Sequence, residues 1–322
     1  MKNILTLLLF SFIFIGCSTG TYEYEYNLDL SESESAIYGG RKDLLIEHLA
    51  VVSLYMVPAQ MSYCTGTLID KEWVLTAAHC VSDDGKLMPD AYNYKIGIGN
   101  TEKEVSRNLH DIDLIVFHEE YSGDGNDIAL IHLASPIEEV SPIKPLPPEI
   151  GLNKEMVDSG VKAEFVGFGY DEYRDYGTKL SFVGDISFFC GEEVHNHLGC
   201  YYDRRSMPFG PIYYTQRDGG PCNGDSGGPA FVIIDGIEYV AGITSYGDSW
   251  CTIYGVSTAV QSFYDWIVDK VPSLLEENED ISEEVLEDEI EEDQESDLLN
   301  EDLESDLFNE DPEQESDVES EL

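Results

Sequence analysis

Short runs of β-branched and aromatic residues dominate the chain from residue 49 onward, and they alternate with clusters of glycine, proline, aspartate and asparagine. This alternation is typical of antiparallel all-β folds, in which the apolar runs form strands and the polar clusters form turns. We predict strands at residues 49–55, 94–98, 113–117, 163–169 and 230–234. No long helical period interrupts them, and the sequence has no G-x-G-x-x-G or Walker motif.

Two further passages organise this β-rich region. The proline-rich residues 142–148 divide it near its middle, and we predict that they connect two β-structures. At its end, residues 260–271 predict a helix, because four apolar residues fall on one face at helical spacing: Phe263, Trp266, Ile267 and Val271.

Acidic residues give the 322-residue chain a formal net charge of −48, but they are unevenly distributed. Residues 273–322 hold 25 of the 65 acidic residues and no basic one. Like-charge repulsion and few apolar residues predict disorder for this tail, whose role stays open between solubility, weak Ca²⁺ collection and docking. The rest of the chain is also acidic, which disfavours nucleic acid and anionic membrane surfaces as partners.

The N-terminus predicts export. An apolar run over residues 4–15 is too short for an ordinary spanning helix and suits a signal peptide, which we place at residues 1–16. The residues before Cys17 resemble the lipobox of bacterial lipoproteins, in which the cysteine is lipidated, although Phe14 replaces the usual leucine. A plain secretory signal is the alternative. Residues 17–36 are polar and acidic, and we expect a pro-segment or tether there.

The number of cysteines supports export and the lipidation of Cys17. The chain has seven cysteines, and removing Cys17 leaves six, an even number that suits disulfide pairing in an oxidising compartment. Six cysteines allow many connectivities, so the sequence alone does not choose among them.

The candidate chemistry centres on residues 221–229, where Ser226 stands among glycines directly after Asp225. Glycine accepts positive φ, so this segment can form a tight loop whose N–H groups converge beside the Ser226 hydroxyl, as in an oxyanion hole. A serine nucleophile also needs a base and an orienting carboxylate. His79 after an apolar run and Asp127 before another are the candidates, in the chain order His, Asp, Ser.

Together these motifs resemble the trypsin/chymotrypsin-type serine proteases, and the domain that we assign to them spans residues 37–272. The resemblance implies two packed antiparallel six-stranded β-barrels with a C-terminal helix. It also implies an endopeptidase without a cofactor, in which Ser226 attacks, His79 transfers the proton and Asp127 orients the histidine. The N–H groups of Gly224 and Ser226 would form the oxyanion hole.

The resemblance and proximity in sequence also suggest disulfides. The expected pairs are Cys64 with Cys80, Cys190 with Cys200, and Cys222 with Cys251. His195 and His197 lie in the Cys190–Cys200 loop, but a disulfide leaves no thiolate ligand, so we assign no metal site.

The start of the domain resembles an activation site. Residues 37–40 are similar to the family's Ile-Val-Gly-Gly mature N-terminus, with Tyr38 in place of valine. In the family, cleavage frees an α-ammonium that inserts beside the aspartate before the serine, which here would pair Ile37 with Asp225. We therefore expect a zymogen. Its activating protease would cut after Ala36, a small residue and not a basic one.

Substrate contacts follow from the same resemblance. Counting back from Cys222 places Gly220 at the base of the primary pocket with Pro221 beside it, and neither is acidic. Rim positions at Gly247 and Gly255 would leave the pocket open, which favours large apolar or aromatic residues before the scissile bond.

A different primary specificity is the alternative, and it depends on Asp218. Asp218 could swing inward and give trypsin-like specificity for lysine and arginine. Ser245 resembles the serine that hydrogen-bonds the triad aspartate, and Ser245, Tyr246 and Gly247 resemble the edge strand that pairs with substrate.

We therefore expect an exported serine endopeptidase acting on proteins or peptides. It would lie in a bacterial cell envelope as a lipoprotein, touching the membrane only through Cys17, or in the periplasm or outside the cell after activation. The alternatives are a non-catalytic binding protein on the protease scaffold and an acidic adaptor that works through its tail.

Overall fold

The computed structural model describes residues 37–275, except residues 38, 44, 84, 124, 172, 174 and 188–209. The signal peptide, the lipidation of Cys17, the pro-segment, the Cys190–Cys200 pair and the acidic tail beyond residue 275 lie outside the described residues. The described part belongs to one compact unit of the chain.

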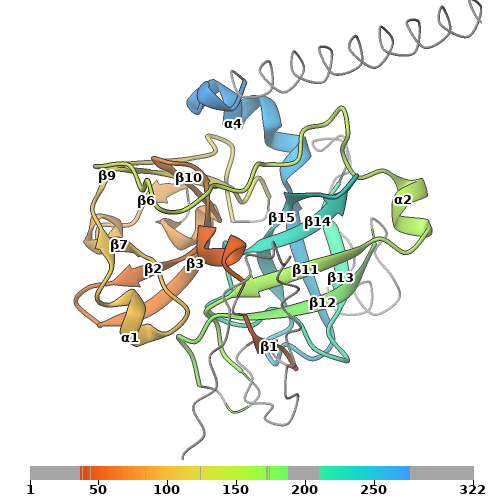
Figure 1. The fold of residues 1–322 in the computed structure, drawn as a ribbon, viewed down its shortest axis with the longest axis horizontal. Coiled ribbons are helices and arrows are strands. Elements are labelled where there is room, and N and C mark those ends of the chain that lie inside the picture. The colour runs from red at the N-terminus through yellow and green to blue at the C-terminus, as the bar shows by residue number, and fades with distance from the viewer. Residues whose placement is uncertain are drawn as a thin grey trace, which may run out of the picture. The chain divides into compact units, whose positions relative to one another are not determined.

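Two seven-stranded antiparallel sheets form the body of this unit (Figure 1). The strands are β1 (Arg41–Lys42), β2 (Val51–Met56), β3 (Met61–Asp70), β4 (Trp73–Thr76), β5 (Ser82–Asp83), β6 (Lys86–Leu87), β7 (Tyr94–Gly97), β8 (Leu109–His110), β9 (Ile112–Phe117), β10 (Ala129–Leu133), β11 (Lys162–Gly167), β12 (Leu180–Ser187), β13 (Ile212–Thr215), β14 (Pro229–Ile234), β15 (Ile237–Gly247) and β16 (Tyr254–Ala259). The helices are α1 (Glu102–Val105), α2 (Lys154–Asp158) and α4 (Tyr264–Lys270), with 3₁₀ turns η1 (Glu47–Ala50), η2 (Ala78–Cys80), η3 (Ala91–Asn93) and η4 (Val260–Phe263).

Strands β5 and β6 form a separate two-stranded sheet. The first seven-stranded sheet has the order β8-β7-β2-β3-β4-β10-β9, and the second has the order β1-β12-β11-β14-β15-β16-β13 with an additional β12–β13 pairing. Each sheet therefore contains six strands of four or more residues and one two-residue strand. The all-β prediction of two barrel-like halves is confirmed. The five predicted strands correspond to β2, β7, β9, β11 and β14, and their ends agree within two residues.

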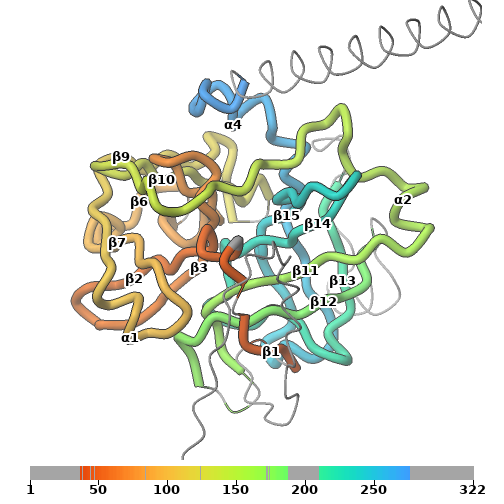
Figure 2. The backbone as a smooth tube through the Cα atoms, viewed as in Figure 1, coloured from red at the N-terminus to blue at the C-terminus, as the bar shows by residue number. Residues whose placement is uncertain are grey.

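The proline-rich passage joins the two sheets, as the sequence predicts. The Ile143 N–H donates to the Leu68 carbonyl of β3, and the Leu146 N–H donates to the Val240 carbonyl of β15, each at 3.0 Å. Figure 2 traces this passage, in yellow-green, between the two halves. The largest apolar core draws residues from both sheets, so the two halves share a buried interface.

The predicted C-terminal helix is divided between η4 and α4. Its residues Phe263, Ile267 and Val271 are buried in the core that the two sheets share, as their helical spacing predicts. Trp266 packs at the edge of that core and donates from its indole N–H to Glu119 at 3.1 Å. None of the helices in the described ranges has both the length and the hydrophobicity needed to cross a lipid bilayer.

Candidate active site

His79 and Asp127 come from the first sheet and are joined by two hydrogen bonds. His79 lies in η2, directly after β4, and its Nδ1–H donates to Asp127 Oδ2 at 2.8 Å. Its backbone N–H donates to Asp127 Oδ1 at 2.9 Å. Ser245 Oγ from β15 donates to the same carboxylate. This network fixes the imidazole ring and leaves His79 Nε2 for proton transfer.

The charges of this pair are set by the same contacts. Burial raises the pKa of Asp127, but the hydrogen bonds from His79 and Ser245 outweigh it and hold that pKa below its usual range. Burial lowers the pKa of His79, but the hydrogen bond and the charge of Asp127 outweigh it and raise that pKa. Asp127 is therefore ionised at neutral pH, and it stabilises the imidazolium that proton transfer would create.

Ser226 lies in a loop between β13 and β14 that only glycines permit. Gly224 and Gly227 have φ values of +100° and +82°. A Cβ on Gly224 would lie 2.8 Å from the Cα of Gly169, and a Cβ on Gly227 would lie 2.3 Å from the carbonyl oxygen of Thr65. The Thr65 N–H donates to the Ser226 carbonyl at 2.8 Å and holds the loop against β3.

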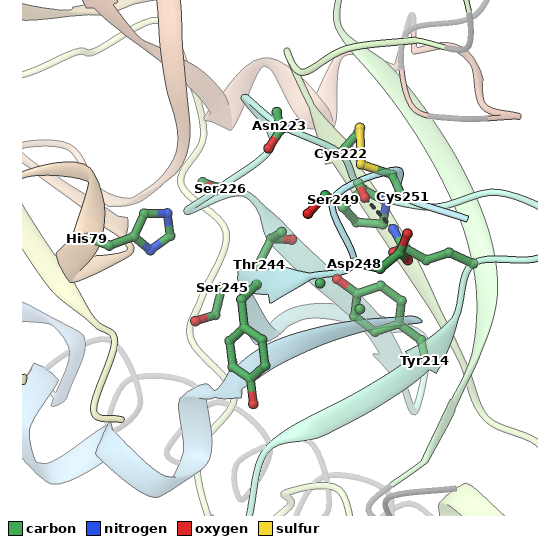
Figure 3. A pocket seen from close by; sticks show the side chains of 15 residues that line it. His79, Tyr214, Cys222, Asn223, Ser226, Thr244, Ser245, Asp248, Ser249 and Cys251 are labelled. Atoms are coloured by element: carbon green, nitrogen blue, oxygen red, sulfur yellow. Dashed lines mark hydrogen bonds between the residues drawn. A yellow bond between two sulfur atoms is a disulfide. The ribbon is translucent and has the colours of Figure 1, made fainter. Parts of the chain in front are cut away.

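The N–H groups of Gly224 and Ser226 are available for an oxyanion. Among the hydrogen bonds of the described residues, none uses either N–H as its donor. His79 and Ser226 line one pocket, as Figure 3 shows, and no hydrogen bond joins their side chains within the described part of the chain. Catalytic hydrogen bonds are often long in the absence of substrate.

Asp225, beside the serine, is a fully buried carboxylate. Its two oxygens accept the N–H groups of Gly169 at 2.7 Å and Cys222 at 2.8 Å. Burial raises the pKa of Asp225 to about 7. The described residues place no side-chain cation within ion-pair distance of it. Ile37 is also fully buried, in the core of the second sheet.

A pocket of about 340 Å³ opens beside Ser226 (Figure 3). Five of the six predicted substrate-binding residues line it: Pro221, Ser245, Tyr246, Gly247 and Gly255. Gly220 does not, because the side chain of Gln216 covers it. A Cβ on Gly220 would lie 3.0 Å from Gln216 Cγ. Gln216, which does line the pocket, therefore lies beside the glycine that the sequence places at the pocket base.

The ring of Tyr214 packs beside Gly255 at the pocket. Strand β13 pairs with β16 so that Tyr214 lies opposite Gly255. A Cβ on Gly255 would lie 2.2 Å from Cε2 of the Tyr214 ring, so the ring fills the space beside that glycine. Gly255 lines the pocket, and the Tyr214 ring lies beside it. Once the pairing of β13 with β16 is known, an aromatic residue opposite a glycine is the signal that locates this contact.

Two carboxylates near the pocket behave differently from each other. Asp218 is exposed and is not among the lining residues, so the inward swing proposed for it does not occur in this structure. Asp248, which sequence reasoning missed, does line the pocket. Its oxygens accept backbone N–H groups from a single loop, namely those of Trp250, Thr252, Ile253 and Tyr254.

Two disulfides brace the site. Cys64 is bonded to Cys80 across a sequence separation of 16 residues, which ties the turn that carries His79 to β3. Cys222 is bonded to Cys251 across 29 residues, which ties the serine loop to the loop of Asp248. Both pairs are the ones that the resemblance implies.

Comparison with known proteins agrees with this geometry. The family model described as Trypsin matches residues 37–267. The chain is 34% identical to a trypsin of Phaedon cochleariae over 217 residues, which cover 64% of this chain and 77% of that relative. It is 32% identical to vitamin K-dependent protein C of Mus musculus over 225 residues, 63% of this chain and 45% of that relative. The chain thus spans less than half the length of protein C.

Proposed function

The chain belongs to the trypsin family of serine endopeptidases, and from that premise we propose that it cleaves peptide bonds through an acyl-enzyme on Ser226. Ser226 Oγ bonds to the substrate carbonyl carbon while its proton passes to His79 Nε2. The oxyanion accepts the N–H groups of Gly224 and Ser226. When the intermediate collapses, the C–N bond breaks and His79 protonates the departing amine. A water molecule then attacks the acyl carbon while His79 accepts its proton. The bond to Ser226 Oγ breaks, His79 returns the proton to that oxygen, and the carboxylic acid product is released.

The contact that carries this proposal is the hydrogen bond between His79 Nδ1 and Asp127 at 2.8 Å. It fixes the tautomer in which Nε2 accepts a proton, at the pocket that Ser226 also lines. The unused N–H groups of Gly224 and Ser226 support the same chemistry, because a binding protein on this scaffold would have no need to keep them free.

Hydrolysis of a protein substrate tests the proposal. A chain that begins at Ile37 should degrade casein, and Ser226→Ala and His79→Ala should each abolish this while leaving the thermal unfolding temperature unchanged. A folded chain with that N-terminus and no hydrolysis, or a Ser226→Ala variant that retains it, would contradict the proposal.

We further propose that the protease is made as a zymogen and activated between Ala36 and Ile37. The buried Asp225 supports this, because a carboxylate with no cation beside it is unstable in its charged form. A freed Ile37 α-ammonium would supply that cation and hold the serine loop in its active shape. Asp225→Asn should therefore prevent activation even in a chain that begins at Ile37.

Export rests on residues 1–36, which lie outside the described residues. We propose that residues 1–16 are removed as a signal peptide, that Cys17 is lipidated, and that cleavage before Ile37 releases the protease from its anchor. Mass spectrometry of the mature protein distinguishes a lipidated Cys17 from a free Ile37. Recovery of the intact first 16 residues from the cell envelope would overturn this route.

A further inference from the structure

Gln216 forms the floor of the pocket where the sequence places only a glycine. It follows β13 directly, and its side chain is buried. Its Nε2–H donates to the carbonyl oxygen of Pro221. A Cβ on Gly220 would lie 3.0 Å from Gln216 Cγ and 3.1 Å from Nε2. The glutamine side chain therefore occupies the place that a side chain at Gly220 would take.

The oxygen of this carboxamide has no hydrogen-bond partner among the described residues. Gln216 lines the pocket, and its Oε1 is buried and accepts no hydrogen bond from the described residues. A Cβ on Gly247, at the rim, would lie 3.3 Å from this oxygen. Because Nε2 is fixed by Pro221, the amide cannot turn to satisfy Oε1 without breaking that bond. A buried acceptor without a donor is unfavourable, so the site favours a ligand that brings one.

Neither Tyr214 nor Gly247, which line the pocket with Gln216, carries a charge. Tyr214 lies against Gly255 with its hydroxyl beside Thr244, and burial raises the pKa of this tyrosine so that it stays neutral. The Asp248 carboxylate is already bound by four backbone N–H groups. A cationic substrate side chain would have to compete with these N–H groups for Asp248, and an apolar side chain would leave Gln216 Oε1 unpartnered.

We propose that Gln216 determines primary specificity and that the protease prefers a side chain with a primary carboxamide, glutamine above all, before the scissile bond. The substrate amide N–H donates to Gln216 Oε1, and the substrate methylenes lie against the Tyr214 ring. This inference rests on the proposed endopeptidase function. It replaces the preference for large apolar residues that an empty pocket base would give.

Matched substrates test the proposal on the unmodified protein. In fluorogenic peptides that differ only before the cleaved bond, glutamine and methionine have similar size, but only glutamine offers an N–H donor. We expect kcat/KM for glutamine to exceed that for methionine by about 10- to 100-fold, the usual effect of losing a buried hydrogen bond. Phenylalanine, arginine, lysine and glutamate should all be poorer than glutamine.

A variant then assigns the preference to one residue. Gln216→Leu keeps the approximate volume and removes the acceptor, so the ratio of glutamine to methionine cleavage should fall to about one, within a factor of roughly three. Gln60→Leu makes the same change at an exposed turn outside the pocket lining, so it is the matched control and should leave the ratio unchanged. A ratio that survives in Gln216→Leu would overturn the assignment.

Labelling with a fluorophosphonate separates the possible failures. If Ser226 is labelled and the wild-type protein prefers phenylalanine, arginine or lysine, the specificity proposal is wrong while the endopeptidase stands. If the folded protein is neither labelled nor active on any peptide, the proposed function itself is wrong. The comparison of glutamine and methionine peptides uses the wild-type protein. It can therefore contradict the specificity proposal even if the Gln216→Leu variant does not fold.

Discussion

The catalytic corner (His79, Asp127 and Ser226) and the pocket floor (Tyr214 and Gln216) adjoin the same cavity, but they are built differently. Each member of the corner lies in a segment whose own sequence fixes it, such as the glycine-rich loop around Ser226. The floor is assembled from side chains that cover glycines on other segments. The chemistry is therefore specified by local motifs, and the selectivity by packing between segments.

Removing the nucleophile should give the largest effect and should be confined to the corner. We expect Ser226→Ala to lower kcat by up to roughly 10⁶-fold, the scale found when a triad serine is removed. Because the proposed hydrogen bond from the substrate amide goes to Gln216 and not to Ser226, inhibitory peptides with glutamine before the reactive bond should bind the variant as they bind the wild type. A parallel loss of peptide binding would show that the two regions are not separable.

Asp127→Asn should give the next largest effect. The amide cannot stabilise the imidazolium and favours the wrong His79 tautomer, so kcat should fall by roughly 10⁴-fold. Steady-state kinetics on the glutamine and methionine peptides should show equal losses for both. Unequal losses would mean that the corner contributes to selectivity.

The pH dependence separates the regions without a mutation. His79 must be neutral to accept a proton, and its pKa is raised above 6.5, so kcat/KM should rise with pH through that raised value and fall about tenfold per unit below it. In the floor, burial raises the pKa of Tyr214, and no other described floor group titrates near neutrality. The glutamine-to-methionine ratio should therefore stay constant between pH 6 and pH 9, and a ratio that drifts would place a titrating group in the floor.

The smallest effect is expected for Tyr214→Phe. The ring that covers Gly255 remains, and only the hydroxyl beside Thr244 is lost, so kcat/KM and the glutamine-to-methionine ratio should each change by less than about threefold. Tyr214→Ala is the contrasting variant. It opens the space beside Gly255 and should raise the relative rate for phenylalanine.

The sequence predicts the catalytic corner better than it predicts the pocket floor. Strands, chain order of the triad residues and the need for glycine at 224 and 227 are local properties, because β-patterning and positive φ are encoded within a few residues. The pocket floor could not be predicted by counting residues back from Cys222. Such a count identifies which residue occupies a backbone position, but it does not show which side chains from other segments pack over that position. Gln216 reaches over Gly220, and Tyr214 reaches Gly255 only through strand pairing.

Covalent labelling shows directly whether Ser226 is the activated nucleophile of this protein. The chain beginning at Ile37 is treated with a fluorophosphonate, and the adduct is located by peptide mass spectrometry, with Ser226→Ala and the uncleaved chain as controls. We expect one adduct per molecule, on Ser226, which is absent from Ser226→Ala and much slower to form in the uncleaved chain. A folded, correctly cleaved protein that takes up no label, or that is labelled at another residue, would contradict this expectation.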